Sequence, residues 1–259
     1  MHVIFSGSLR RSLVLTSFLV ISTLPLMAQS EPAQISPRDG GAHELLESIF
    51  IPPKSNAPFS LTLETEWTRP MGNGGTYTLA NKRRIMRDSS GRIYQERWLL
   101  APKGGNIPST MNYIQIADPF DHTAYNCEIE TKICEAVRYG ASVSTTYQPE
   151  VGVTGPLPNG QGSLKHEALG SKTIEGLDTA GSRDTISINA GVFGNDQPAT
   201  TVRENWYSPQ LGINLLSTLD SFRIGKEQFK ATQVSTDEPD PKFFSLPEGF
   251  SVVDHRNSE

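Results

Sequence analysis

The chain has 259 residues, a formal net charge of −5 and two cysteines. This acidic balance argues against nucleic-acid binding, which needs a basic face, and against adhesion to an anionic membrane through charge alone. The 18 prolines and 22 glycines favour many strands and turns over long helices.

Residues 1–30 are typical of a secretory signal. Arg10 and Arg11 precede an uncharged, largely apolar stretch from Ser12 to Leu26, and residues 28–30 fit a small-x-small cleavage site. The apolar stretch is about fifteen residues, shorter than the roughly 20 that a spanning helix needs, so a cleaved signal is favoured over a membrane anchor. Cleavage removes two arginines and no acid, which takes the net charge from −5 to −7. We therefore predict an exported protein, periplasmic or extracellular, with no stable membrane span after cleavage.

The predicted domain organisation is simple. Residues 31–42 are a polar, proline-containing lead-in, and residues 43–254 are expected to form a single antiparallel β domain. His43–Phe50 is the one clear helix candidate, because its apolar residues recur at helical spacing and Pro52 follows it.

Alternation of apolar and polar side chains predicts strands along most of the domain, most clearly from Phe59 to Trp67. Asp240–Phe244 is expected to form a single helical turn, and Gly140–Gly162 a long mobile loop. Successive strands with short connections favour an antiparallel meander. The further strands are predicted over 76–87, 92–100, 113–117, 123–128, 133–139, 164–173, 176–190, 201–207, 213–219, 225–236 and 250–253.

The two cysteines fit a disulfide. Cys127 and Cys134 flank a tight turn over 129–132, which places them opposite each other across a hairpin. Such a pair closes in an oxidising compartment. Redox catalysis favours Cys-x-x-Cys and a zinc site needs three or four ligands, so a structural bond is the preferred interpretation.

Asp118, Asp121 and His122 form the most enzyme-like cluster. Two carboxylates and an imidazole are able to bind a metal or share a proton. The segment also separates two predicted strands, where aspartates are ordinary turn residues. No nucleophile elbow, phosphate-binding glycine loop or paired metal motif accompanies it. No catalytic residue, cofactor or metal is therefore predicted.

A run of arginines is the one concentrated positive feature. Arg83, Arg84, Arg87 and Arg92 gather on the hairpin that turns at 88–91. They form a candidate surface for an acidic partner or an anionic head group. The alternative is a solvated ladder paired with Glu96 and neighbouring acids, which also protects a sheet edge.

The aromatic and aliphatic residues of the strands supply a candidate ligand site. Apolar concave surfaces bind apolar ligands, with a few polar groups fixing orientation. The alternative is that these side chains build the core. The candidate ligand-binding residues are Leu63, Trp67, Trp98, Ile116, Trp206 and Leu215.

The order of motifs in the C-terminal part resembles the lipoprotein-carrier-like (LolA-like) superfamily and related exported families of unknown function. The motifs are the 169–176 segment, Gly181 with Arg183, the 204–212 segment around Trp206, and the 238–250 segment. The resemblance implies a mainly β fold, a strongly curved antiparallel sheet (half-barrel), here with one short N-terminal helix and a helical turn near the C-terminus. It also implies binding of a lipid or a lipidated protein in the hollow. This chain has little predicted helix to cover the hollow as a lid. We therefore carry over the fold that the resemblance implies, but not the ligand that family members carry.

Three functional hypotheses follow. The leading one is a non-enzymatic envelope protein that binds an apolar or amphiphilic ligand, or a lipidated partner. The second is a protein-interaction or envelope-sensing module that uses the arginine hairpin. The third is a hydrolase or metal enzyme at Asp118, Asp121 and His122. The sequence fixes neither the ligand nor the oligomeric state.

Overall fold

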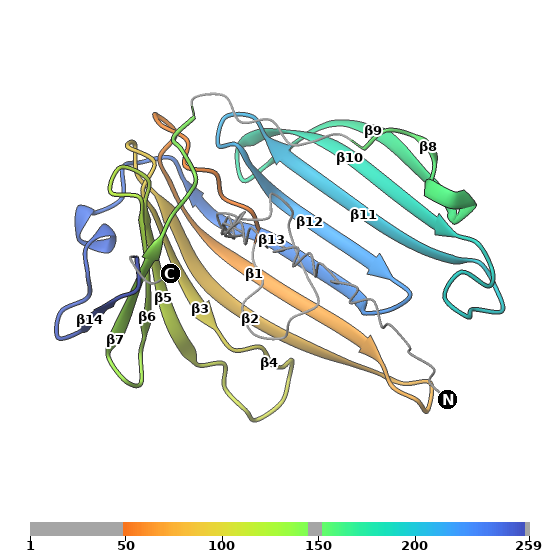
Figure 1. Cartoon of the computed structure of the whole chain (residues 1–259), viewed down its shortest axis with the longest axis horizontal. Helices are drawn as coiled ribbons and strands as arrows, with labels where there is room; N and C mark the ends of the chain where they lie inside the picture. Colours follow the sequence, from red (N-terminus) through yellow and green to blue (C-terminus); the bar gives the residue numbers. More distant parts are fainter. Residues whose placement is uncertain (1–48, 145–151, 257–259) are drawn as a thin grey trace, which may run out of the picture. The chain divides into compact units, whose positions relative to one another are not determined.

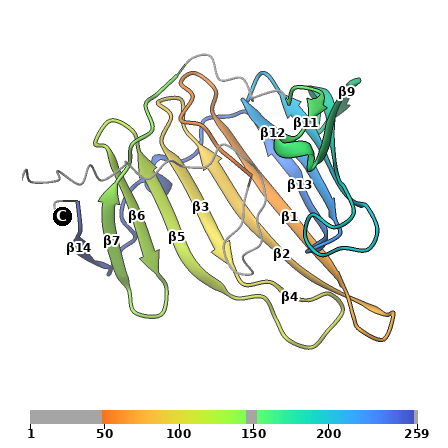
Figure 2. The ribbon, with the colours of Figure 1, turned by 45° about the vertical axis from the view of Figure 1, so that its right-hand side comes forward.

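The computed structural model describes residues 49–144 and 152–256, which lie in one compact unit. In this part of the chain, strands form one 14-stranded sheet that is curled along its length (Figures 1 and 2). The sheet order is β14-β7-β6-β5-β3-β2-β1-β13-β12-β11-β10-β9-β8, with β4 beside β2. The strands are β1 (Phe59–Pro70), β2 (Thr76–Arg87), β3 (Ile93–Trp98), β4 (Ala101–Pro102), β5 (Met111–Asp118), β6 (Thr123–Glu128), β7 (Ile133–Arg138), β8 (Gly155–Pro156), β9 (Gly162–Ile174), β10 (Leu177–Ile188), β11 (Ala199–Ser208), β12 (Ile213–Ser221), β13 (Gly225–Ser235) and β14 (Ser251–Asp254).

Strand β1 lies near the middle of the sheet and sets its two faces. It pairs with β2 on one side and β13 on the other, so the first and second halves of the chain join along it. Because side chains alternate along a strand, its odd-numbered residues share one face and its even-numbered residues the other. We call the face that carries Leu63 the core face and the face that carries Glu66 the groove face.

The main hydrophobic cluster lies on the core face. Phe59, Leu63 and Ile85 are fully buried there, and Phe229 and Leu215 join them from β13 and β12. Burying side chains of this size stabilises the fold by about 1.5–3 kcal/mol each. The cluster also includes Ile49, Ile51, Leu61, Ile93, Leu177, Leu211, Ile213 and Ala231.

A second, smaller cluster lies on the groove face of β2, β3 and β5. Met86, Tyr94 and Ile116 pack there against Phe244, which belongs to a 3-10 turn, η2 (Pro241–Phe244). The chain then continues to β14, which pairs with β7 in parallel. The sheet is therefore mixed, and the prediction of a purely antiparallel sheet is wrong at this edge. The strand lies parallel because η2 carries the chain back across the sheet before β14 begins.

The predicted helices are the other point of difference. Most of His43–Phe50 lies outside the described residues, and Ile49 and Phe50, which lie within them, are not helical. The turn predicted near Phe244 is a 3-10 turn, and no α-helix occurs over 49–144 and 152–256. The predicted loop from Gly140 to Gly162 holds β8 and a second 3-10 turn, η1 (Pro158–Gly160). In the described residues no helix is long and apolar enough to cross a membrane.

Candidate functional site

Three of the six candidate ligand-binding residues lie together on the core face. Leu63 and Leu215 have no exposed surface and belong to the main cluster. Trp67 lies on the same face of β1 and donates its Nε1 hydrogen to the carbonyl of Ile224 at 2.8 Å. These three side chains are buried on the core face, as in a packed core.

The other three lie on the groove face, at separate places. Ile116 is buried in the second cluster beside Phe244. Trp206 lies on β11 with Lys172 Nζ 3.6 Å from its ring centroid. Trp98 ends β3 and donates to Glu96 at 3.0 Å. The structure therefore does not bring the six residues into one hollow, because strand alternation divides them between two faces.

Trp98 lies where the ladder between β2 and β3 opens. β2 pairs with β3 only over Ile85–Arg87 and with β4 only at Leu79 and Ala80, so the residues between have no ladder partner on that side. Two side chains bridge the opening. Asn81 Nδ2 donates to the Trp98 carbonyl at 2.6 Å, and the Glu96 carboxylate accepts from the backbone N–H of Arg84 at 3.2 Å.

A pocket of about 640 Å³ occupies this opening, and we call it the Trp98 pocket. Its wall includes apolar surface from Trp98, Ala101 and Ile107. It also includes Thr65 and Asn81, whose Oγ1 and Oδ1 atoms are buried without a hydrogen-bond partner in the described structure. An unsatisfied buried oxygen costs about 1–3 kcal/mol, so both atoms would gain from a donor. The remaining lining residues are Glu64, Glu66, Ala80, Lys82, Pro102, Lys103 and Ser109.

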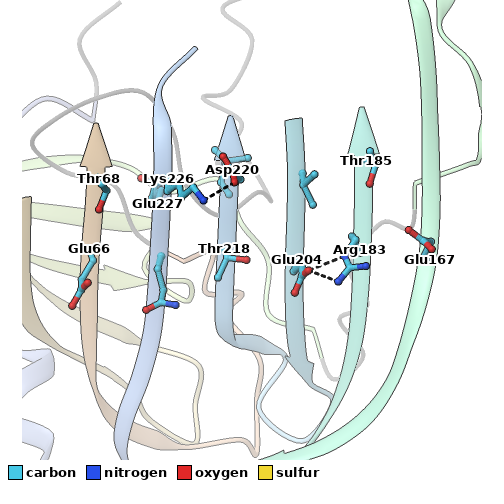
Figure 3. Close-up of a pocket in the computed structure, with 13 residues that line it drawn as sticks. Glu66, Thr68, Glu167, Arg183, Thr185, Glu204, Thr218, Asp220, Lys226 and Glu227 are labelled. Carbon is cyan, nitrogen blue, oxygen red and sulfur yellow. Dashed lines mark hydrogen bonds and ion pairs between the residues drawn. The ribbon is translucent and has the colours of Figure 1, made fainter. Parts of the chain in front are cut away.

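A second hollow, of about 650 Å³, crosses the groove face from β1 to β9 (Figure 3). We call it the groove. Hydroxyl, amide and charged side chains from six strands dominate its wall, and no aromatic residue takes part. It is lined by Glu66, Thr68, Glu167, Arg183, Thr185, Val202, Glu204, Thr218, Leu219, Asp220, Lys226, Glu227 and Gln228.

Ion pairs organise the charges of the groove. Arg183 on β10 donates Nε to Glu204 on β11 at 2.7 Å, and Lys226 on β13 lies 3.1 Å from Asp220 on β12 (Figure 3). Glu167 accepts from Lys165 at 2.9 Å, and that bond is the main reason its pKa lies below the usual range. The side chains are partly exposed, so each pair adds little stability but fixes donors and acceptors along the wall.

The two hollows meet at one residue. Glu66 lines both the Trp98 pocket and the groove, and its Oε1 accepts from Lys103 at 2.6 Å. Glu66 lies opposite Ala80 on β2 and Gln228 on β13. The apolar pocket and the polar groove therefore adjoin at this position of β1.

The candidate arginines are engaged within the protein. Arg87 is fully buried, and its guanidinium donates to the carbonyls of Ala57 and Pro52, among others. Burial lowers its pKa to about 10. Arg83 is also buried. An exposed patch of all four arginines is therefore not formed.

Arg84 and Arg92 hold the C-terminal segment. The Arg84 guanidinium lies 5.3 Å from the ring of Phe243, and that of Arg92 lies 5.2 Å from the ring of Phe244. Such cation–π contacts contribute about 0.5–2 kcal/mol. In addition, the Glu238 carboxylate accepts from the backbone N–H of Ser89 at 3.0 Å. The arginine hairpin thus docks residues of its own chain.

The enzyme-like cluster is built as a turn. Asp118 Oδ1 accepts from the backbone N–H of Phe120 at 2.9 Å and of Asp121 at 3.2 Å. His122 takes a left-handed backbone conformation with φ of 47°. Within the described ranges, no three His, Cys, Asp or Glu side chains are grouped so that they could hold a metal ion.

The predicted disulfide between Cys127 and Cys134 is present. Both cysteines lie on the groove face of the β6–β7 hairpin, directly opposite in register and fully buried. The disulfide lies beside the second cluster, and we interpret it as a structural bond that joins β6 to β7 near the edge of the sheet.

Sequence reasoning missed the residues that connect the two hollows. The alternation from Phe59 to Trp67 predicts Thr65 on the buried face and Glu66 on the wet face, but it marks neither as a site residue, and no motif singles out Asn81. The break in the β2–β3 ladder has no marker in the sequence, because Arg97 and Trp98 continue the strand pattern. Only the acidic residues on the wet faces of neighbouring strands hint at the groove.

No protein-family model matches this chain, and no curated protein matches it. Among solved structures, an uncharacterized conserved protein from Thermus thermophilus is 9% identical, with 77% of this chain and 91% of that chain covered and a TM-score of 0.41. The MucA/MucB complex of Pseudomonas aeruginosa gives 13% identity, 76% and 58% coverage, and a TM-score of 0.37. The lipoprotein LppX of Mycobacterium tuberculosis gives 8% identity, 70% and 91% coverage, and a TM-score of 0.29. Likenesses this low carry no functional inference, so the function proposed below rests on the chain's own residues.

Proposed function

We propose that this chain is an exported, non-enzymatic binding protein for an amphiphilic ligand. The apolar part of the ligand occupies the Trp98 pocket, and its polar part lies in the groove. The observation that carries this proposal is the meeting of an apolar hollow and a polar hollow at Glu66. A molecule that spans both hollows must have an apolar part and a polar part.

The Trp98 pocket favours a ligand whose apolar segment carries a hydrogen-bond donor at or near its end. Trp98 and Ile107 offer apolar surface, worth about 25 cal/mol for each Å² that a ligand covers. The buried oxygens Thr65 Oγ1 and Asn81 Oδ1 have no hydrogen-bond partner, and a ligand whose hydroxyl or amine reaches them would satisfy them. A pure hydrocarbon would leave these oxygens unsatisfied.

The groove favours a polar group that carries both donors and acceptors. Its two cations, Arg183 and Lys226, pair with two of its five carboxylates, and Glu66 and Glu167 accept from Lys103 and Lys165 outside the lining. Hydroxyls of Thr68, Thr185 and Thr218 lie between these groups. A ligand here competes for exposed, weakly held ion pairs, in a wall that holds more carboxylates than cations. A zwitterionic or polyhydroxyl head group matches this wall.

The test is calorimetric titration with lysophosphatidylcholine below its critical micelle concentration, with glycerophosphocholine as the head group alone. We expect the whole amphiphile to bind and the head group alone to bind at least about tenfold more weakly, because the apolar contribution is lost. Trp98→Ala should weaken binding of the amphiphile by a similar factor. Trp206→Ala is the control, since Trp206 lies on the same face but lines neither hollow.

A second pair of variants removes the concern that a tryptophan substitution disturbs folding. Ile107→Ser alters an exposed residue of the Trp98 pocket, whereas Val153→Ser alters an exposed residue outside both hollows. We expect weaker binding only for Ile107→Ser. Equal binding by all four variants, with circular dichroism unchanged, would overturn the proposal.

A further inference from the structure

The sheet ends on one side at β14 and on the other at β8 (Figure 1). β14 pairs with β7 along one of its sides, and within the described ranges no strand pairs with its other side. An open edge of this kind presents backbone N–H and C=O groups that match those of another extended chain. We call the open side of β14 the β14 edge.

The bonds between β14 and β7 show which backbone groups face the β14 edge. The N–H groups of Ser251 and His255 donate to carbonyls on the β7 side, at 3.0 Å and 2.8 Å. Successive residues of a strand direct their backbone groups to opposite sides. The N–H and C=O groups of Val252 and Asp254 therefore point away from β7, toward the β14 edge.

The opposite edge of the sheet is protected against pairing. β8 contains Pro156, which has no N–H to donate. The Thr154 hydroxyl accepts from the backbone N–H of His166 on β9 at 2.8 Å, and the register between β9 and β10 shifts at Gly181. Prolines, side chains and irregular register are means by which proteins block a sheet edge. β14 has no proline, and its register with β7 is regular.

The β14 edge is apolar at its centre and balanced in charge. Val252 is 45% exposed and Val253 is 42% exposed. Asp254 forms an ion pair with Arg256 at 2.6 Å, and His255 is the one other ionisable side chain from 251 to 256. Two such edges therefore approach each other without a net charge from these pairs.

A second copy of β14 fits this edge in one antiparallel register. Across a twofold axis, the outward-facing residues must pair with each other, which places Val252 opposite Asp254 of the second copy. Each such pair exchanges both of its N–H···O bonds, and the axis produces the pair twice. Val253 then meets Val253 of the second copy at the axis. A register shifted by two residues would set Asp254 against Asp254, and like charges directly opposite are destabilising.

The charge nearest to this axis on the neighbouring strand is that of Glu135, which lies opposite Val253 on β7. In the paired arrangement the two copies of Glu135 are three strand spacings apart, about 14 Å. This separation exceeds the screening length of about 8–10 Å at physiological salt, so their repulsion is small.

We infer that β14 pairs with β14 of a second copy of this chain, so that two sheets join edge to edge in a symmetric dimer. Because β14 is short, the contact is weak, with a dissociation constant of about 10 µM to 1 mM. The dimer does not depend on the proposed ligand, since no residue of β14 lines either hollow.

The test is sedimentation equilibrium of the exported protein from about 1 µM to about 1 mM. Val253→Lys and Val253→Glu each set like charges against each other at the axis, whereas an equimolar mixture of the two variants sets opposite charges there. Val252→Pro removes an N–H that faces the β14 edge and leaves the bonds to β7 in place. Ile186→Lys is the matched control, because Ile186 is 37% exposed on β10, away from both edges.

We expect the wild type and Ile186→Lys to associate equally, and Val252→Pro and each Val253 variant to associate at least about tenfold more weakly. Mixing Val253→Lys with Val253→Glu should restore association, while circular dichroism and the urea midpoint stay unchanged in every variant. A wild type that remains monomeric up to about 1 mM would overturn the inference. Undiminished association of the β14 variants would also overturn it, as would an equal loss in Ile186→Lys. Failure of the mixture to associate would reject the twofold pairing at Val253.

Discussion

The carboxylate of Glu96 occupies the place of a backbone acceptor opposite the N–H of Arg84. Glu96 Oε2 accepts from that N–H at 3.2 Å, while Oε1 accepts from the Arg84 Nε at 2.8 Å. Trp98 Nε1 donates to the same carboxylate. A side chain thus bridges two strands where their ladder has opened, and it bonds Trp98, which lines the pocket.

Replacing this bridge should destabilise the fold and disturb the pocket together. Glu96→Ala leaves buried donors without an acceptor, and we expect a loss of about 3 kcal/mol in the free energy of unfolding. Urea denaturation measures the loss, and a red shift of tryptophan fluorescence reports exposure of Trp98. Glu96→Gln retains an acceptor and should lose less. Equal stability of Glu96→Ala and the wild type would contradict the bridging role.

Arg87 should be essential for stability and not for partner recognition. Its guanidinium holds the carbonyls of Ala57 and Pro52, and a lysine cannot reach these acceptors with the same planar geometry. We expect Arg87→Lys to cost about 3 kcal/mol in thermal or urea unfolding. Arg138→Lys, at an exposed position, is the control and should change stability by no more than about 0.5 kcal/mol. A neutral Arg87→Lys variant would show that the buried bonds are dispensable.

Gly181 should tolerate no side chain. A Cβ atom at this position would lie 2.7 Å from Trp206 Cζ3, so the indole would have to shift. We expect Gly181→Ala to destabilise by about 1–3 kcal/mol. Gly155→Ala adds a methyl group where no atom lies within 4 Å and should be nearly neutral. Combining Gly181→Ala with Trp206→Leu should restore part of the loss; a full additive loss would mean that Trp206 is not the obstacle.

Stability should fall at alkaline pH through two buried tyrosines. Burial raises the pKa of Tyr94 and of Tyr139 to about 12. A raised pKa means that the folded state holds the proton more tightly, so the stabilisation is complete below about 10, the unfolded value, and is lost as the pH rises toward 12. We expect about 2 kcal/mol for each group over this interval.

Tyr94→Phe isolates one of these contributions. Its free energy of unfolding should decline less steeply between pH 9.5 and 11.5, on the order of one proton fewer, than that of the wild type. Arg87, whose lowered pKa acts in the opposite direction above about 10, is present in both proteins and cancels in the comparison. Parallel curves for the two proteins would show that Tyr94 ionises freely in the folded state.

The sequence alone determined the strands and the disulfide. The period-two pattern from Phe59 to Trp67 survives folding because one face of β1 is buried and the other is wet, so burial and polarity follow the same alternation. The turn at 129–132 fixed Cys127 opposite Cys134, since a short hairpin leaves one register. These features depend on neighbours close in the chain.

Only the tertiary structure decided which residues share a surface. Leu63 and Trp98 are both apolar strand residues, yet they lie on opposite faces, because register between distant strands assigns each side chain its face. The pairing of β1 with β13 unites Glu66 with Gln228 and Lys226 across more than half the chain. At the break between β2 and β3, beside the Trp98 pocket, the Glu96 carboxylate accepts from the Arg84 N–H in place of a ladder bond, and no local pattern encodes such a contact. The same holds for β14, whose parallel pairing with β7 depends on where η2 docks.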